Sequence, residues 1–348
     1  MFPCRAGTHD NPYLAILTAA LAQEGVRCRP LLWPRMPDAL HVHWLEAPLW
    51  GRIATRLPLL AELRVGVIWL LARLLRGLGR PVIWTAHNLA PHDFANARHR
   101  RLYARMRAGF LPLVSDVICM GHSAGAEVRA AFPELAGARF HLIPHPGYGP
   151  HFDGIAPQTP PELAGLSLPE TTPLIATFGH VRAYKGLPAL VLQLRQSPLD
   201  FRFVIAGKGP EPEMAALVKA IDQDPRILFL PRRISDAEVV GLTRRAALVL
   251  FNFQTLLNSG SVLASLSLGR PVLAPALGMM TELQGRLGPD WVHLFHGPIT
   301  AERVAAALAM PPKTRGPDLR GFAPDQIARQ HAAIYRGQPL PRGVLQWS

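Results

Sequence analysis

The sequence predicts an α/β protein of two doubly wound, Rossmann-like domains with parallel sheets that face each other across a cleft. Three observations support this. Short apolar strands alternate with helical stretches up to about residue 150, the alternation restarts near residue 174, and an aperiodic stretch rich in Pro and Gly lies between. Such a succession builds parallel sheets, because each helix returns the chain to the start of the next strand. With 348 residues and 49% hydrophobic content, the chain can form two cores.

The first domain is expected over residues 1–150. Its strands are expected at 39–44, 81–88, 116–122 and 138–145, where apolar and β-branched residues are concentrated. Its helices are expected at 12–24, 57–79, 96–113 and 123–132.

The second domain is expected over residues 174–320, after a linker at 151–173. Its strands are expected at 174–180, 201–208, 227–232, 247–253, 271–275 and 291–297, and its helices at 187–197, 211–222, 235–246, 260–268 and 299–310. A final helix within 321–348, near 323–337, is expected to cross back to the first domain. Ligands bind such sheets at the carboxyl ends of their strands.

The net charge indicates which kinds of partner the protein can bind, and the cysteine content indicates its cellular compartment. A net charge of +13 draws the chain to polyanions such as anionic lipid headgroups or diphosphates. No basic–aromatic interleaving or reader motif points to nucleic acid, so none is expected. Cys4, Cys28 and Cys119 are too few and scattered for a disulfide framework or a zinc site. Without an apolar signal segment or a long uncharged run, we expect a cytoplasmic protein.

The segment 57–80 is unusually apolar for a surface helix and carries Arg64, Arg73, Arg76 and Arg80 among its leucines. One interpretation is a helix that lies on an anionic membrane surface with its arginines at headgroup level, so that the protein associates peripherally with the inner face of the cell membrane. The other is an ordinary core helix.

The segment TFGHVRAYKGL (177–187) predicts a diphosphate site. Gly179 follows a buried strand, and Arg182 and Lys185 precede the N-terminus of a helix. Two cations beside a helix N-terminus neutralise a diphosphate and hold its oxygens. The alternative is a solvated surface loop.

The segment NSGSVLASLSLGRPVLAP (258–275) predicts a second part of that site. Asn258, Ser259, Gly260 and Ser261 stand where a helix begins, so hydroxyls and unpaired backbone N–H groups converge there and can bind a phosphate without metal. The alternative is a simple N-cap.

Two further patterns are weaker. AGKGPE (206–211) places Gly207 in a turn like that of dinucleotide folds, but G-x-G-x-x-G is incomplete, so hydride transfer is not expected and a tight turn is the alternative. Asp222 and Asp224 form a D-x-D pair that can hold a divalent ion. Its position at a helix end favours ordinary turn residues, so no metal or other cofactor is expected.

Polar residues follow two strands of the first domain, in HVHWLE (41–46) and TAHNLAPHD (85–93). A transfer to a hydroxyl needs a general base, for which Asp93 is the first candidate and Glu46 the second, followed by His87 and His92. For each, the alternative is a structural hydrogen bond or a solvated loop.

Taken in order, these motifs, with NPYL (11–14) before them and GPDWVHLFHG (288–297) after them, resemble the bacterial exopolysaccharide mannosyltransferases of the GumI type. The similarity runs from about Asn11 to Tyr335 and extends more widely to group-1 glycosyltransferases of the GT-B fold. It implies inverting transfer of mannose from GDP-mannose, bound by the second domain, to a polyprenyl-diphosphate-linked oligosaccharide on the first. Arg182, Lys185 and residues 258–261 would hold the donor diphosphate. By topology alone, RRISD (232–236), with Arg233, is expected near the nucleotide base.

The sequence departs from the wider family in two places. The glutamate pair of many retaining group-1 enzymes falls at Ala264 and Leu256, so a retaining mechanism of that kind is not expected. NPYL comes after only ten residues, which leaves little room for a strand before it and points to a truncated or misassigned start. The alternatives are a retaining transferase with another nucleotide sugar and a non-catalytic subunit that binds nucleotide sugar.

Overall fold

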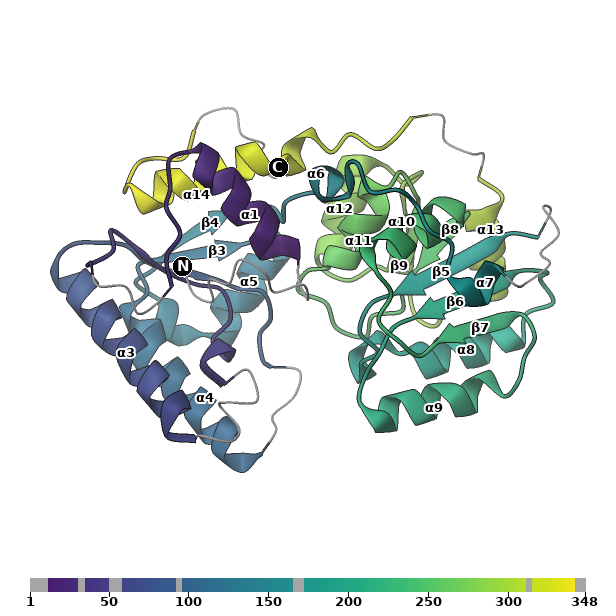
Figure 1. The fold of residues 1–348 in the computed structure, drawn as a ribbon, viewed down its shortest axis with the longest axis horizontal. Helices are drawn as coiled ribbons and strands as arrows, with labels where there is room; N and C mark the ends of the chain where they lie inside the picture. Colours follow the sequence, from purple (N-terminus) through teal and green to yellow (C-terminus); the bar gives the residue numbers. More distant parts are fainter. Residues whose placement is uncertain are drawn as a thin grey trace. The chain divides into compact units, whose positions relative to one another are not determined.

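The computed structural model describes residues 12–30, 35–49, 58–91, 96–164, 172–310 and 315–341. The chain divides into two compact units, Met1–Pro146 with Arg320–Ser348, and Gly147–Leu319. Each contains a parallel sheet with helices packed against it (Figure 1), which confirms the predicted fold class of two α/β domains.

The sheet of the first unit has the order β1-β2-β3-β4 and all its described pairs are parallel. The strands, each within its predicted range, are β1 (Leu40–Val42), β2 (Val82–Thr85), β3 (Asp116–Cys119) and β4 (Arg139–Leu142). The main helices, also near their predicted positions, are α1 (Pro12–Gln23), α3 (Pro58–Gly77), α4 (Ala97–Phe110), α5 (His122–Ala131) and α14 (Pro324–Tyr335).

The C-terminal helix α14 packs against α1 in the first unit. Figure 1 shows these two helices on one side of the sheet and α3 and α4 on the other. Apolar side chains from α1, α14 and the strands form a common core, which includes Leu17, Ile118, Ile143 and Ile327. Burial of this apolar surface holds α1 and α14 together. No helix within the described ranges is long and apolar enough to span a membrane.

The sheet of the second unit has the order β10-β9-β8-β5-β6-β7, again parallel throughout. Its strands are β5 (Leu174–Phe178), β6 (Arg202–Ala206), β7 (Ile227–Leu230), β8 (Leu248–Leu250), β9 (Val272–Pro275) and β10 (Val292–Phe295). The helices between them are α8 (Leu187–Arg195), α9 (Glu211–Ile221), α10 (Asp236–Arg245), α11 (Gly260–Ser267), α12 (Met279–Leu287) and α13 (Ala301–Leu308). The sequence analysis did not predict α12.

This strand order reverses direction between β5 and β8, which are neighbours in the sheet. The chain moves outward from β5 through β6 to β7, and then from β8 through β9 to β10. The carboxyl ends of β5 and β8 are therefore the switch point of the sheet, which is the usual ligand position in a doubly wound fold. The two predicted phosphate-binding motifs follow these two strands.

The stretch 151–173, expected to be a linker, falls within the second unit. The stretch begins inside the short helix α6 (Gly149–Phe152). The described part of it also contains α7 (Pro161–Ala164). The N–H of Gln158 donates to the carbonyl of Ala237 at 2.9 Å. The carbonyl oxygen of Gln158 lies 2.0 Å from where a Cβ on Gly241 would stand. The glycine thus lets this segment pack directly on α10.

Candidate active site

The loop after β5 is shaped by two glycines with positive φ. Gly179 (φ +104°) directly follows the strand, and its N–H donates to the carbonyl of Ala206 at 3.0 Å. A single turn of 3-10 helix (Ala183–Lys185) follows, and Gly186 (φ +54°) begins α8. Residues with a Cβ rarely adopt these conformations, so the glycines fix the path of the loop. The loop carries Arg182 and Lys185 to the carboxyl edge of the sheet.

Lys185 is a buried cation, with 7% of its surface exposed. Burial, and secondarily the nearby charge of Arg182, lower its pKa to about 8. Within the described ranges no carboxylate forms an ion pair with its ammonium group. A Cβ on Gly179 would stand 3.1 Å from Nζ, so the ammonium lies against the backbone of the β5 turn. A buried ammonium without a counter-ion favours an anionic ligand.

The start of α11 lies against the same glycine. The hydroxyl of Ser261 is 3.4 Å from where a Cβ on Gly179 would stand. Ser259 is the N-cap of α11, and its side chain accepts from the N–H of Val262. Asn258 and Gly260 are half-buried in the same turn. The structure thus brings together the two motifs that the sequence placed 80 residues apart.

Backbone and amide contacts hold these loops together. The Asn252 side chain donates to the carbonyl of Gly186 at 2.9 Å, and the N–H of Gln254 donates to the carbonyl of Tyr184 at 2.7 Å. Residues 252–254 come from the loop after β8, whereas 184–186 follow β5. The sequence analysis did not identify Asn252 or Gln254. Asn and Gln are common in loops, so the sequence alone does not indicate that these two residues join the loops after β5 and β8.

Gly207 and Arg233, which were also predicted to bind the donor, lie in the loops after β6 and β7, whereas Lys185 lies in the loop after β5. A Cβ on Gly207 would stand 2.0 Å from the carbonyl oxygen of Gly179, so this glycine lets the β5 and β6 loops approach each other. Its position is explained by backbone packing. Arg233 is exposed beyond β7, which is separated from β5 by β6.

The D-x-D pair, Asp222 and Asp224, lies before the amino end of β7, whereas Lys185 lies beyond the carboxyl end of β5. Asp222 pairs with Arg195 at 2.8 Å and Asp224 with Arg226 at 2.9 Å. These carboxylates are thus used in ion pairs of the turn. Among the described residues, no cluster of His, Cys, Asp or Glu has the arrangement of a metal site.

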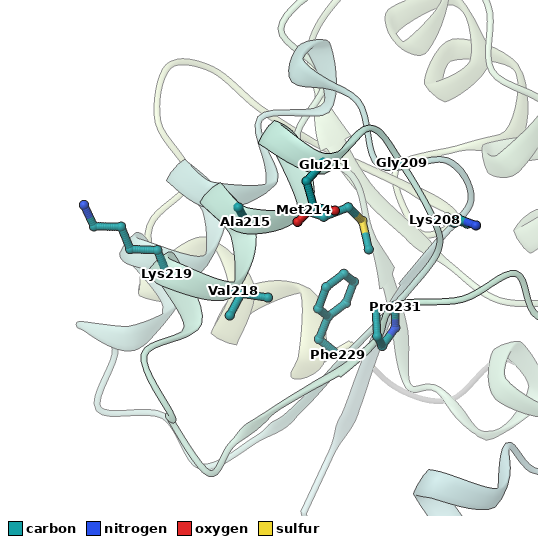
Figure 2. A pocket seen from close by; sticks show the side chains of 9 residues that line it. All are labelled: Lys208, Gly209, Glu211, Met214, Ala215, Val218, Lys219, Phe229 and Pro231. Carbon is teal, nitrogen blue, oxygen red and sulfur yellow. The ribbon is translucent and has the colours of Figure 1, made fainter.

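An apolar pocket lies between α9 and β7 in the second unit. Figure 2 shows Met214, Val218, Phe229 and Pro231 along it, whereas the side chains of Lys208 and Lys219 point away. Lys185 and Ser261 are not among the residues that line it. We therefore place the candidate phosphate site at Gly179 and not in this pocket.

In the first unit, the ends of β1 and β2 bring Glu46 and His87 close together. Asn88 donates to the carboxylate of Glu46 at 3.2 Å, while the ring of His87 stacks on Trp44 with centroids 4.2 Å apart. Glu46 is half-buried, and burial raises its pKa. A carboxyl group with a raised pKa is a better proton acceptor near neutral pH. Asp93 and His92 lie outside the described residues.

The half-buried His87 lies against a cluster of buried imidazoles. One ring N–H is shared between Nδ1 of His43 and Nε2 of His87, 3.2 Å apart. The ring of His41 stands 4.1 Å from that of His43 and is hydrogen-bonded to Thr85 and Tyr335. Burial lowers the pKa of His41, His43 and His87 well below the ordinary value. The rings are therefore neutral at physiological pH.

His43 is a candidate site residue that we did not predict from the sequence. It is fully buried directly after β1, and its Nε2 has no hydrogen-bond partner within the described part of the chain. The alternation of H-V-H in a strand places His41 and His43 on one face, and this period was the available signal.

No family model matches the chain. The chain is 30% identical over 342 residues to a GDP-mannose:glycolipid 4-beta-D-mannosyltransferase of Xanthomonas campestris pv. campestris, an alignment that covers 95% of this chain and 89% of the relative. The chain belongs to this mannosyltransferase family. It is accordingly a glycosyltransferase, as the order of its motifs predicted.

Solved structures agree with the fold of this mannosyltransferase family member. Sucrose-phosphate synthase from Thermosynechococcus elongatus matches with a TM-score of 0.60 at 17% identity, over 96% of this chain and 81% of that one. Trehalose-6-phosphate synthase OtsA matches with a TM-score of 0.57 at 13% identity, over 95% and 77%. At these identities the similarity establishes the GT-B fold alone.

Ala264 and Leu256 stand where the resemblance to group-1 enzymes leads us to expect a glutamate pair. Ala264 is buried within α11, and Leu256 is half-buried in the loop before it. The methyl group of Ala264 cannot accept a hydrogen bond from a ribose hydroxyl. This mannosyltransferase family member therefore lacks that carboxylate at the start of α11.

Proposed function

We propose that the chain transfers mannose from GDP-mannose to an oligosaccharide carried on a polyprenyl diphosphate, with inversion to a beta linkage. The reaction would contribute to assembly of an exopolysaccharide repeat unit at the cytoplasmic face of the cell membrane. The activity of the relative and the order of the motifs support this proposal. A single structural observation carries it further, namely the meeting of Lys185 and Ser261 at Gly179.

The site at Gly179 suits the diphosphate of the donor. The Lys185 ammonium is already desolvated, so it interacts with a phosphate oxygen more strongly than an exposed lysine would. The N-terminus of α11 adds backbone N–H donors and the positive end of a helix dipole. Arg182 supplies a second cation in the same loop. Together these groups stabilise the charge that develops on the leaving diphosphate, and the proposal requires no metal.

Transfer then proceeds by a single displacement. The acceptor hydroxyl oxygen attacks C1 of the mannosyl group while the bond from C1 to the diphosphate oxygen breaks, so GDP leaves with the bonding electron pair. The hydroxyl proton passes to a carboxylate, for which we propose Asp93 or Glu46. The burial of Glu46 and its contact with Asn88 support it as a proton acceptor.

The proposal is tested with a panel of radiolabelled nucleotide sugars and a lipid-diphosphate oligosaccharide. We expect label to enter the lipid fraction from GDP-mannose, and the new linkage to be beta. An alpha linkage would show retention. Label from a UDP-sugar alone would establish another donor, and tight GDP binding without transfer would support the non-catalytic alternative.

A further inference from the structure

Helices α3 and α4 carry apolar and cationic side chains toward solvent on adjoining faces. We propose that they dock on an anionic lipid bilayer through a surface that we call the lipid-facing surface: Leu59, Leu63, Leu70, Leu74, Arg73, Arg101 and Arg105. This inference rests on the proposed function, because an enzyme with a lipid-borne acceptor must work at the bilayer.

The leucines of α3 form an exposed row. Leu59 is 75% exposed, Leu63 60%, Leu70 61% and Leu74 44%. Their spacing of four and seven residues places them on one side of the helix. The opposite side is buried through Ala61, Val65, Ile68, Ala72 and Leu75. Single exposed leucines are ordinary on protein surfaces, but four on one side of a helix favour an interaction site.

The two helices pack directly against each other. The indole ring of Trp69 occupies the space where a Cβ on Gly109 would stand, 2.3 Å from its nearest atom, so α3 and α4 are in direct contact. Arg98 of α4 also pairs with Glu62 of α3 at 2.7 Å. Figure 1 shows the two helices side by side. Glu62 and Trp69 face α4, and the leucine row follows on the adjoining solvent side.

Arg101 and Arg105 extend the row of leucines with positive charge. They follow Arg98 by three and seven residues, so they lie on the side of α4 beside α3, and both are exposed. Glu62 is the single carboxylate in the sequences of the two helices, and it is paired with Arg98. The lipid-facing surface is therefore apolar in its row and strongly cationic along one flank.

An anionic bilayer complements both properties. Leucines enter the boundary between headgroups and acyl chains, while arginines reach the phosphates. A second copy of this chain would meet the surface with its own arginines, and like charges would oppose each other. The occupant that satisfies both the apolar row and the cations is a membrane rich in anionic headgroups.

The test measures binding of the full chain to vesicles of phosphatidylcholine, with and without phosphatidylglycerol, by flotation. One variant replaces leucines (Leu63→Gln, Leu70→Gln, Leu74→Gln) and another arginines (Arg73→Gln, Arg101→Gln, Arg105→Gln). Leu192→Gln, a leucine of α8 that is 47% exposed, is the matched control. Circular dichroism and GDP binding verify that each variant folds.

We expect wild type and Leu192→Gln to bind phosphatidylglycerol vesicles more tightly than neutral ones, and less so at high salt. The arginine variant should lose on the order of a hundredfold in this preference, about fivefold for each arginine. The leucine variant should lose binding to both kinds of vesicle.

Equal binding of wild type and the leucine variant would overturn the lipid-facing surface. So would weak binding of wild type to both vesicles, or a dimer without lipid that the leucine variant dissociates. Binding as expected without any mannose transfer would instead refute the proposed function and leave the surface in place.

Discussion

His43 and His87 are joined through their ring nitrogens, with Nδ1 of the first 3.2 Å from Nε2 of the second. This contact links the buried end of β1 to the half-buried residue that follows β2. Because a neutral imidazole donates through one nitrogen and accepts through the other, the contact couples the tautomer of His87 to that of His43. His43 thus positions His87.

Replacement of His43 tests this positioning role. His43→Gln should lower kcat for transfer by about tenfold to a hundredfold, because a small displacement of a site residue is costly. The KM for the donor should stay nearly constant, since His43 lies in the other unit from Lys185. His151→Gln in the second unit is the control. A rise in donor KM with unchanged kcat would rule out the role.

The buried histidines make stability depend on pH. Burial lowers the pKa of His145 and of His331 to about 4, below the unfolded value near 6.5. Between these values the unfolded chain binds more protons, so stability falls as pH decreases from about 6.5 toward 4. Each group then costs up to about 3 kcal/mol. Urea unfolding followed by tryptophan fluorescence should show a lower midpoint at pH 5 than at pH 7.5. His331→Gln should reduce that difference, and an unchanged difference would contradict this cause.

Lys185 makes donor binding depend on pH in the alkaline range. Its pKa of about 8 means that the free protein loses this charge as pH rises through 8, and affinity for GDP should fall with it. Lys185→Met should bind GDP about tenfold to a hundredfold more weakly at pH 7. Titration calorimetry from pH 7 to 9.5 measures both effects. If Lys185→Met keeps the wild-type pH dependence, another group is responsible.

Glycines of the second unit should differ sharply in their tolerance of alanine. Gly207→Ala places a Cβ 2.0 Å from the carbonyl oxygen of Gly179, so the backbone must shift and both stability and GDP affinity should fall, the former by about 1–3 kcal/mol. Gly285→Ala in α12 meets nothing within 4 Å and should stabilise by about 0.5–1 kcal/mol. Thermal unfolding compares them, and equal effects would contradict the packing argument.

The sequence predicted the repeated strands and both phosphate-binding motifs, because apolar runs followed by Gly179 or Ser259 are local signals. It could not show that Lys185 is buried or that Ser261 meets Gly179, since these depend on strand order. The contact between His43 and His87 was missed because it joins residues that follow β1 and β2, and the pairing of these two strands is not a local signal. Helix α12 was missed because it is short, is bracketed by Gly278 and Gly288 and contains Gly285, which weakens the helical signal.

The central claim is that Lys185 serves mannosyl transfer from GDP-mannose. The most direct test measures radiolabel passed from GDP-mannose into a lipid-diphosphate oligosaccharide by wild type, Lys185→Ala and Lys208→Ala, an exposed lysine in the neighbouring loop. We expect transfer by wild type and Lys208→Ala and a loss of about a hundredfold or more for Lys185→Ala. Transfer by Lys185→Ala at the wild-type rate would contradict that claim.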